Sequence, residues 1–157
     1  SFFSFLESTE SPCIITASNT DPGGDYINQQ LKGIAKKRDN VIFCDNLGQE
    51  GYVYTIRNCK VVIGNSSSAL IEVPACNKYT INIGKRQDGR LKSESVVDIG
   101  SKFSIKEIRR IIELIDYHDE TKFDNLPYGG TGAGAKIKKA WKSIDFDKLR
   151  LKEFYDV

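Results

Sequence analysis

Short apolar runs alternate with helical or polar stretches along most of this chain. A short, continuously apolar strand suits a parallel sheet that is covered on both faces, because neither face then meets water. The alternation therefore predicts an α/β fold, a Rossmann-like parallel sheet with helices on both faces. The expected strands lie within residues 12–19, 40–48, 60–65, 79–83 and 94–100.

Helical patterns separate these runs. Residues 26–38 place apolar side chains on one face and end in basic residues, as an amphipathic helix does. Residues 105–116 carry an isoleucine on one face at nearly every turn, and Ser104 is a candidate N-cap. Two weaker helices are expected over 51–59 and 66–77.

Composition excludes several classes of function. The net charge is only +2, from 23 basic and 21 acidic residues, so charge alone gives no reason to expect nucleic acid or an anionic membrane as a partner. No apolar run approaches the roughly 20 residues of a membrane helix. The four cysteines form no CxxC pair and His118 is the only histidine, so we expect reduced thiols, no metal site, no cofactor and a cytoplasmic location.

The stretch VVIGNSSSALIE, residues 61–72, carries an unusual excess of hydroxyls. An apolar run ends there in glycine and asparagine, and three serines then lead into a helical pattern. A helix N-terminus offers unpaired N–H groups and a partial positive charge, which suit an anion such as phosphate. The alternative is that one serine is an N-cap and the other two fill a turn.

Polar side chains follow other expected strands too. Glu72 could hold a ribose diol, or could lie on the solvated face of its helix. Arg86 lies in a basic loop after the strand at 79–83 and could bind phosphate or simply be solvated. Asn19 and Asp21 lie in a turn after the first strand. Ligands of open α/β sheets bind at the carboxyl ends of the strands, where these loops would meet.

Two further motifs do not support a function. The glycine-rich stretch at 128–137 lacks the lysine followed by serine or threonine of a phosphate loop, and no apolar strand precedes it. His118 lies among acidic residues after the isoleucine-rich helix, and we interpret it as a helix-end residue rather than a catalyst.

Three segments, in this order, carry a resemblance to a known family: VVIGNSSSALIE, INIGKRQDGR and LPYGGTGAGAKI. Together they resemble the C-terminal half of the UDP-N-acetylglucosamine 2-epimerase family, over residues 14–137. The match is closer to the hydrolysing branch, which forms N-acetylmannosamine for sialic acid synthesis. The other branch typically has Asp-Ser-Gly-Gly where this chain has residues 65–68, and a Thr-Glu-Arg-Pro type of loop at 86–90.

The resemblance implies a GT-B type fold, in which two Rossmann-like domains face a cleft. Residues 1–120 would be the second, UDP-binding domain. Residues 121–157 would be a glycine-rich crossover and a C-terminal helix that pack on the N-terminal domain. The chain contains no methionine, so we expect a piece of a longer protein. The full-length protein is expected to be a homodimer, with no nucleic acid or membrane partner.

The resemblance also implies a UDP site built from the loops after the strands. Ser66 and Ser67 match serines expected on the phosphates, and Glu72 matches the acid expected on the ribose. Arg86 matches an arginine of the nucleotide site, and Asn19 and Asp21 match a polar loop near the cleft. Asn46 and Leu47 fall in the segment that holds uracil. Ser68 stands at a position that varies among relatives.

The implied reaction is anti elimination of UDP with removal of the proton at C2 of the sugar, followed by addition of water to give free N-acetylmannosamine. The acidic residues that would move these protons lie in the N-terminal domain, so we assign no catalytic residue here. The chain alone would bind UDP weakly and remain inactive. The alternatives are a non-catalytic UDP-sugar-binding module and the donor domain of another GT-B glycosyltransferase.

Overall fold

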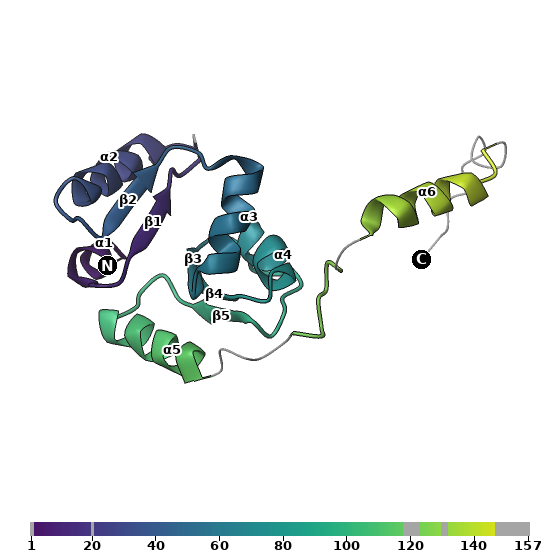
Figure 1. Cartoon of the computed structure of the whole chain (residues 1–157). Coiled ribbons are helices and arrows are strands. Elements are labelled where there is room, and N and C mark those ends of the chain that lie inside the picture. The colour runs from purple at the N-terminus through teal and green to yellow at the C-terminus, as the bar shows by residue number, and fades with distance from the viewer. Residues whose placement is uncertain (1, 20, 118–122, 130–131, 147–157) are drawn as a thin grey trace.

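Helices and strands alternate along the chain, as the apolar pattern predicts. The computed structural model describes residues 2–19, 21–117, 123–129 and 132–146 (Figure 1). Its elements are α1 (Phe2–Ser8), β1 (Cys13–Thr16), α2 (Gly24–Ala35), β2 (Val41–Cys44), α3 (Gly48–Asn58), β3 (Val61–Gly64), α4 (Ser68–Ala75), β4 (Tyr79–Ile83), β5 (Val96–Ile99), α5 (Ile105–Tyr117) and α6 (Ala133–Ser143).

Every strand pairing in the described residues is parallel, which confirms the predicted α/β class. β1 pairs with β2, with Cys13 opposite Val41. β3 pairs with β4 and β4 with β5, which gives the order β3-β4-β5. The strands therefore form two hydrogen-bonded sheets, where the sequence suggested one. The two inner strands, β1 and β3, do not pair with each other in the described part of the chain.

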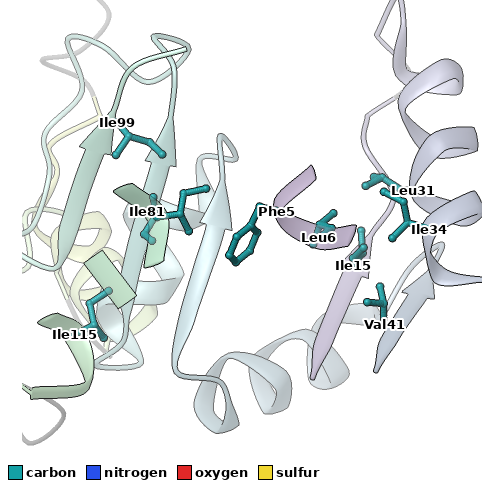
Figure 2. Close-up of a cluster of buried hydrophobic side chains, with 10 residues drawn as sticks. Phe5, Leu6, Ile15, Leu31, Ile34, Val41, Ile81, Ile99 and Ile115 are labelled. Carbon is teal, nitrogen blue, oxygen red and sulfur yellow. The ribbon is translucent and has the colours of Figure 1, made fainter. Parts of the chain in front are cut away.

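One hydrophobic core joins the two sheets. Ile15 of β1 and Ile81 of β4 belong to the same buried cluster, together with Phe5 of α1 and Ile108 of α5. Figure 2 shows Phe5 and Leu6 of α1 lying between the two sheets. α1, α2 and α5 therefore cover the same side of both sheets.

The other side of the β3-β4-β5 sheet is covered by α4. Thr80 is fully buried, and its hydroxyl donates to the carbonyl of Ala69 at 2.8 Å. Since side chains alternate along a strand, Thr80 faces α4 while Ile81 faces the main core. α3 meets α4 through a hydrogen bond between Tyr52 and Ser68. Helices thus cover both faces of the β3-β4-β5 sheet, as the resemblance implies. On the β1-β2 sheet, Ile14 and Ile42 face away from the core and are 50% and 57% exposed.

α5 shows how closely a strong local pattern can fix an element. It begins at Ile105, and the Ser104 hydroxyl accepts from the Glu107 N–H at 3.1 Å. The Glu107 carboxylate accepts from the Ser104 N–H at 3.5 Å, which completes a capping box and confirms the predicted N-cap. β4 likewise spans the residues predicted for it.

The C-terminal helix, α6, makes no part of the core. None of its residues is buried, and Ile137 and Trp141 are 61% and 63% exposed. Figure 1 shows α6 set apart from the elements that carry the sheets. The division at residue 120 and the docking of 121–157 on another domain stay predictions, and His118 lies outside the described residues.

The structure also describes the helix lengths and the cysteines, on which the expectations about membranes and disulfides depend. Within the described residues, no helix combines the length and the apolar character needed to cross a bilayer. All four cysteines are free thiols and half-buried. Burial raises the pKa of the Cys13 and Cys59 thiols, although Arg38 and Lys78 respectively act in the opposite direction.

Candidate functional site

The loops that follow β1, β3 and β4 contact one another at the carboxyl ends of the strands. The Gln87 amide in the loop after β4 donates to the Asn65 carbonyl after β3 at 2.7 Å. Arg86, beside it, lies 3.9 Å from the carboxylate of Asp21 in the loop after β1. The predicted meeting of polar loops on one rim is therefore present in the structure.

The serine loop, residues 65–68, turns directly into α4. The N–H groups of Ala69 and Leu70 bond back to the carbonyls of Ser66 and Ser67, at 3.1 and 3.0 Å. Ser66 Oγ accepts from the Ser68 N–H at 3.4 Å, a long bond typical of a serine turn. Ser66 and Ser67 are exposed, and in the described chain nothing engages the Ser67 hydroxyl. The exposed hydroxyls of Ser66 and Ser67 are therefore available to an anion at this end of α4, whereas the N–H groups of the first turn are already bonded to Ser66 and Ser67.

Ser68 differs from the other two serines because its hydroxyl is already engaged. It shares a hydrogen bond with the Tyr52 hydroxyl of α3, and both residues are half-buried. Burial raises the pKa of Tyr52, although the bond to Ser68 acts in the opposite direction. Tyr52 therefore stays protonated at neutral pH, and Ser68 joins α4 to α3.

Glu72 lies one turn into α4 and is exposed. The cost of burying a carboxylate therefore does not arise, and the side chain is open to solvent or to a ligand hydroxyl. Glu72 is near enough to Tyr52 to raise the pKa of the phenol slightly. It thus lies on the side of α4 that faces α3.

The loop after β1 is shaped by a close backbone approach. A Cβ on Gly24, the first residue of α2, would lie 2.1 Å from the carbonyl oxygen of Asn19. The Ser18 N–H donates to the Asn28 side chain at 2.8 Å, which fixes the start of the same loop. Asn19 and Asp21 are exposed at its tip, and Asp21 faces Arg86.

The segment after β2 starts α3. The Asn46 side-chain oxygen accepts from the Gly48 N–H at 2.7 Å, so this side chain holds the first turn of the helix. Leu47 is half-buried. Tyr52, one turn further along α3, connects this segment to the serine loop through Ser68.

Sequence reasoning missed Gln87 and Tyr52. Gln87 is 2% exposed and sits between two exposed residues of a basic loop, where its composition gives no sign of burial. Tyr52 lies on a weakly patterned helix. The partner of Gln87 lies 22 residues away in the sequence and that of Tyr52 lies 16 residues away, so no local signal could reveal these contacts.

A polar network lies nearby at the ends of β4 and β5. Asn82 is fully buried and donates to the Asp98 carboxylate at 2.7 Å, and Lys92 contacts both oxygens of that carboxylate at 2.8 and 2.9 Å. Burial raises the pKa of Asp98, but the bonds from Lys92 and Asn82 outweigh it and hold the pKa below its usual value. This network fixes the strand ends beneath the loops.

In the described residues no group of three or more histidine, cysteine or acidic side chains is placed to hold a metal ion. A separate open hollow lies along α2 and includes the Lys32–Asp45 ion pair at 2.9 Å. It contains none of the predicted site residues, so it is distinct from the rim where the loops meet.

Comparison with known proteins points to one family. Residues 2–142 match the model of the family described as UDP-N-acetylglucosamine 2-epimerase. The polysialic acid biosynthesis protein P7 of Escherichia coli is 32% identical over 100% of this chain. A protein of Campylobacter jejuni named GDP/UDP-N,N'-diacetylbacillosamine 2-epimerase (hydrolyzing) is 31% identical over 92% of this chain.

The chain is much shorter than these relatives. It spans 40% of the Escherichia coli protein and 38% of the Campylobacter protein. A Legionella pneumophila protein named UDP-N,N'-diacetylbacillosamine 2-epimerase (hydrolyzing) is 31% identical over 58% of this chain, which covers 24% of that protein.

Proposed function

The chain belongs to the UDP-N-acetylglucosamine 2-epimerase family, and from that premise we propose that it forms the UDP-binding part of a hydrolysing UDP-sugar 2-epimerase. The observation that carries the proposal is the contact between the serine loop and the arginine loop. Gln87 bonds to Asn65 at 2.7 Å, so the loop that carries Arg86 is attached to the loop that carries the serines. In this proposal the guanidinium and the serine hydroxyls act together as donors to a diphosphate.

In this proposal the diphosphate lies against Ser66, Ser67 and Arg86. Arg86 is exposed, and its 3.9 Å separation from Asp21 is longer than a tight ion pair. An anion with two phosphates can therefore compete for it. Ser68 supports the site indirectly, because its hydroxyl is bonded to Tyr52.

The nucleoside occupies the side of the rim formed by α3 and α4. Glu72 accepts from the ribose hydroxyls, which its exposed position on α4 permits. The segment at Asn46 and Leu47 holds uracil through backbone groups, because the Asn46 side-chain oxygen is already used by Gly48. Asn19 and Asp21 lie on the opposite side, toward the sugar.

The proposed reaction breaks the bond between the anomeric carbon and the UDP oxygen while the proton at C2 is removed. UDP leaves with the bonding electron pair, and the sugar becomes a glycal-like intermediate. Water then adds to the double bond, its hydroxyl going to the anomeric carbon and a proton to C2, so free N-acetylmannosamine results. The residues of this chain stabilise the charge that develops on the diphosphate.

The proton-transfer groups belong to another part of the parent enzyme in this proposal. The relatives are more than twice as long as this chain, which leaves room for a second domain. α6 exposes Ile137 and Trp141, and we propose that residues 121–157 return to that domain and pack on it.

A product assay on the longer protein that contains this chain tests the proposal. With UDP-N-acetylglucosamine as substrate, we expect free N-acetylmannosamine and UDP in equal amounts. An epimerised UDP-sugar would place the protein in the non-hydrolysing branch. Transfer of the sugar to an acceptor, or UDP binding without turnover, would contradict the proposal and support a glycosyltransferase donor domain or a binding module.

A further inference from the structure

The loop between β4 and β5 is held to the sheet near each of its ends. At its start, the Gly84 N–H donates to the Ile99 carbonyl of β5 at 2.8 Å. Near its end, Lys92 contacts both carboxylate oxygens of Asp98 at 2.8 and 2.9 Å. Between these two anchors the loop is exposed, except at one residue.

That residue is Gln87. Two turns surround it, because the Asp88 N–H donates to the Lys85 carbonyl at 3.0 Å and the Arg90 N–H donates to the Gln87 carbonyl at 3.4 Å. Gln87 is 2% exposed, whereas Arg86 and Asp88 on either side of it are exposed. The turns therefore direct one polar side chain inward and Arg86, its neighbour in the chain, outward.

The orientation of the Gln87 amide is fixed by its partner. The amide nitrogen lies 2.7 Å from the Asn65 carbonyl oxygen, and since a carbonyl only accepts, the amide must present its NH2 group there. Asn65 is followed directly by Ser66, whose carbonyl accepts from the Ala69 N–H in the first turn of α4. One hydrogen bond thus links the residue beside Arg86 to the residue beside Ser66.

This hydrogen bond should contribute little net stability. The Gln87 side-chain oxygen is buried without a partner in the described part of the chain, and an unpaired buried acceptor costs at least as much free energy as one neutral hydrogen bond contributes. Asn65 is an exposed residue, so water can bond to its carbonyl once the amide is removed. An apolar side chain of similar length should therefore replace Gln87 at little cost to folding.

Given the UDP site proposed above, we propose that Gln87 is a positioning residue of that site, which holds Arg86 and the serine loop at the separation that one diphosphate spans. Gln87 is buried and acts through its neighbours, because hydrogen bonds to phosphate oxygens depend steeply on distance and angle. Without the bond to Asn65, UDP binding must also order two loops that move separately, and part of the binding free energy is lost.

Gln87→Met in the longer protein tests this role, since methionine is similar in length but cannot donate to Asn65. Calorimetric titration should show UDP binding that is about tenfold weaker, with a melting temperature near that of the unmodified protein. Asn40→Ala is the matched control. It removes hydrogen bonds from the Asn40 amide to the Thr9 and Ser11 carbonyls, at 3.0 and 2.9 Å, beside the amino end of β2. It should lower the melting temperature and leave the UDP affinity unchanged.

Gln87→Glu adds a rescue that depends on pH and does not depend on how methionine packs. At pH 7 its carboxylate repels the Asn65 carbonyl, so UDP binding should be weaker than in the unmodified protein. As the pH falls toward about 5, the buried carboxyl group takes up a proton and can donate to Asn65, so the ratio of the two affinities should approach one. The corresponding ratio for Gln87→Met should stay constant, because methionine does not titrate.

Three results would overturn the positioning role. The first is equal UDP affinity of Gln87→Met and the unmodified protein. The second is a similar loss of affinity in Asn40→Ala, which would attribute the effect to stability alone. The third is an affinity ratio for Gln87→Glu that does not change with pH. In each case UDP binding by the unmodified protein leaves the proposed function standing, whereas no UDP binding by the unmodified protein removes both.

Discussion

The amide of Gln87 is 2% exposed and donates to the Asn65 carbonyl at 2.7 Å, while its own oxygen is buried without a partner in the described chain. A glutamate at this position would place a carboxylate against a carbonyl oxygen. We expect Gln87→Glu to lower the free energy of unfolding at pH 7 by about 1–3 kcal/mol, because a buried hydrogen bond is replaced by repulsion. Urea unfolding at fixed pH measures this, and an unchanged midpoint would contradict it.

The same variant separates the hydrogen bond from simple packing. Burial raises the pKa of a carboxyl group, so the introduced glutamate should protonate as the pH falls toward 5 and then donate to Asn65. A group whose pKa is raised on folding stabilises the folded protein more as the pH falls. The difference in free energy of unfolding between Gln87→Glu and the unmodified chain should therefore become smaller at low pH. Gln87→Ala, which cannot regain the bond, should show the same deficit at both pH values.

The lowered pKa of Asp98 predicts that the free energy of unfolding falls as the pH falls, which is the opposite sign to Gln87→Glu. Its pKa is held below the usual value in the folded chain by Lys92 and Asn82. A carboxylate with a lowered folded pKa adds stability above its unfolded pKa of about 3.9, and this stability is lost as the pH falls through the folded pKa. Unfolding measured between pH 5 and pH 2 should therefore show a loss in the unmodified chain that is reduced in Asp98→Asn. If the two proteins lost the same stability over this pH range, the stabilising role of the bonds from Lys92 and Asn82 to Asp98 would be contradicted.

At the scale of single elements, the start of α2 depends on the absence of a side chain. Gly24 brings its backbone so near to Asn19 that a Cβ would lie 2.1 Å from the carbonyl oxygen. Gly24→Ala should therefore destabilise the chain by about 1–3 kcal/mol, since backbone atoms must move. Gly33, on the same helix, has no atom within 4 Å of its would-be Cβ. Gly33→Ala is the matched control and should stabilise by about 0.5–1 kcal/mol in the same thermal unfolding experiment.

The elements that the sequence predicted well are those with strong local signals. α5 has an isoleucine stripe and a capping box, so its start at Ile105 could be predicted. α1 could not, because its apolar residues look like a short patch and become helical only where Phe5 and Leu6 enter the core.

The same reasoning applies to the candidate site. The polar loops could be predicted because each follows an apolar strand. Gln87 and Tyr52 could not, because their partners lie 22 and 16 residues away. The sheet order likewise depends on long-range pairing, so the division of the described strands into two sheets became visible only in the structure.

At the scale of the whole molecule, three contacts connect the polar segments that follow the strands. A contact links the β1 loop to the β4 loop, another links the β4 loop to the serine loop, and a third links α4 to α3. These contacts position the groups that the family resemblance assigns to UDP.

Calorimetric titration of UDP into the longer protein tests this account most directly. We predict binding that Ser67→Ala and Arg86→Ala each weaken by about 1–3 kcal/mol, because charge-assisted hydrogen bonds to the diphosphate are lost. Both side chains are exposed, so the melting temperature should hardly change. Arg110→Ala, an exposed arginine of α5, is the control and should bind UDP like the unmodified protein. The absence of UDP binding, or equal affinity in all three variants, would contradict the proposed site.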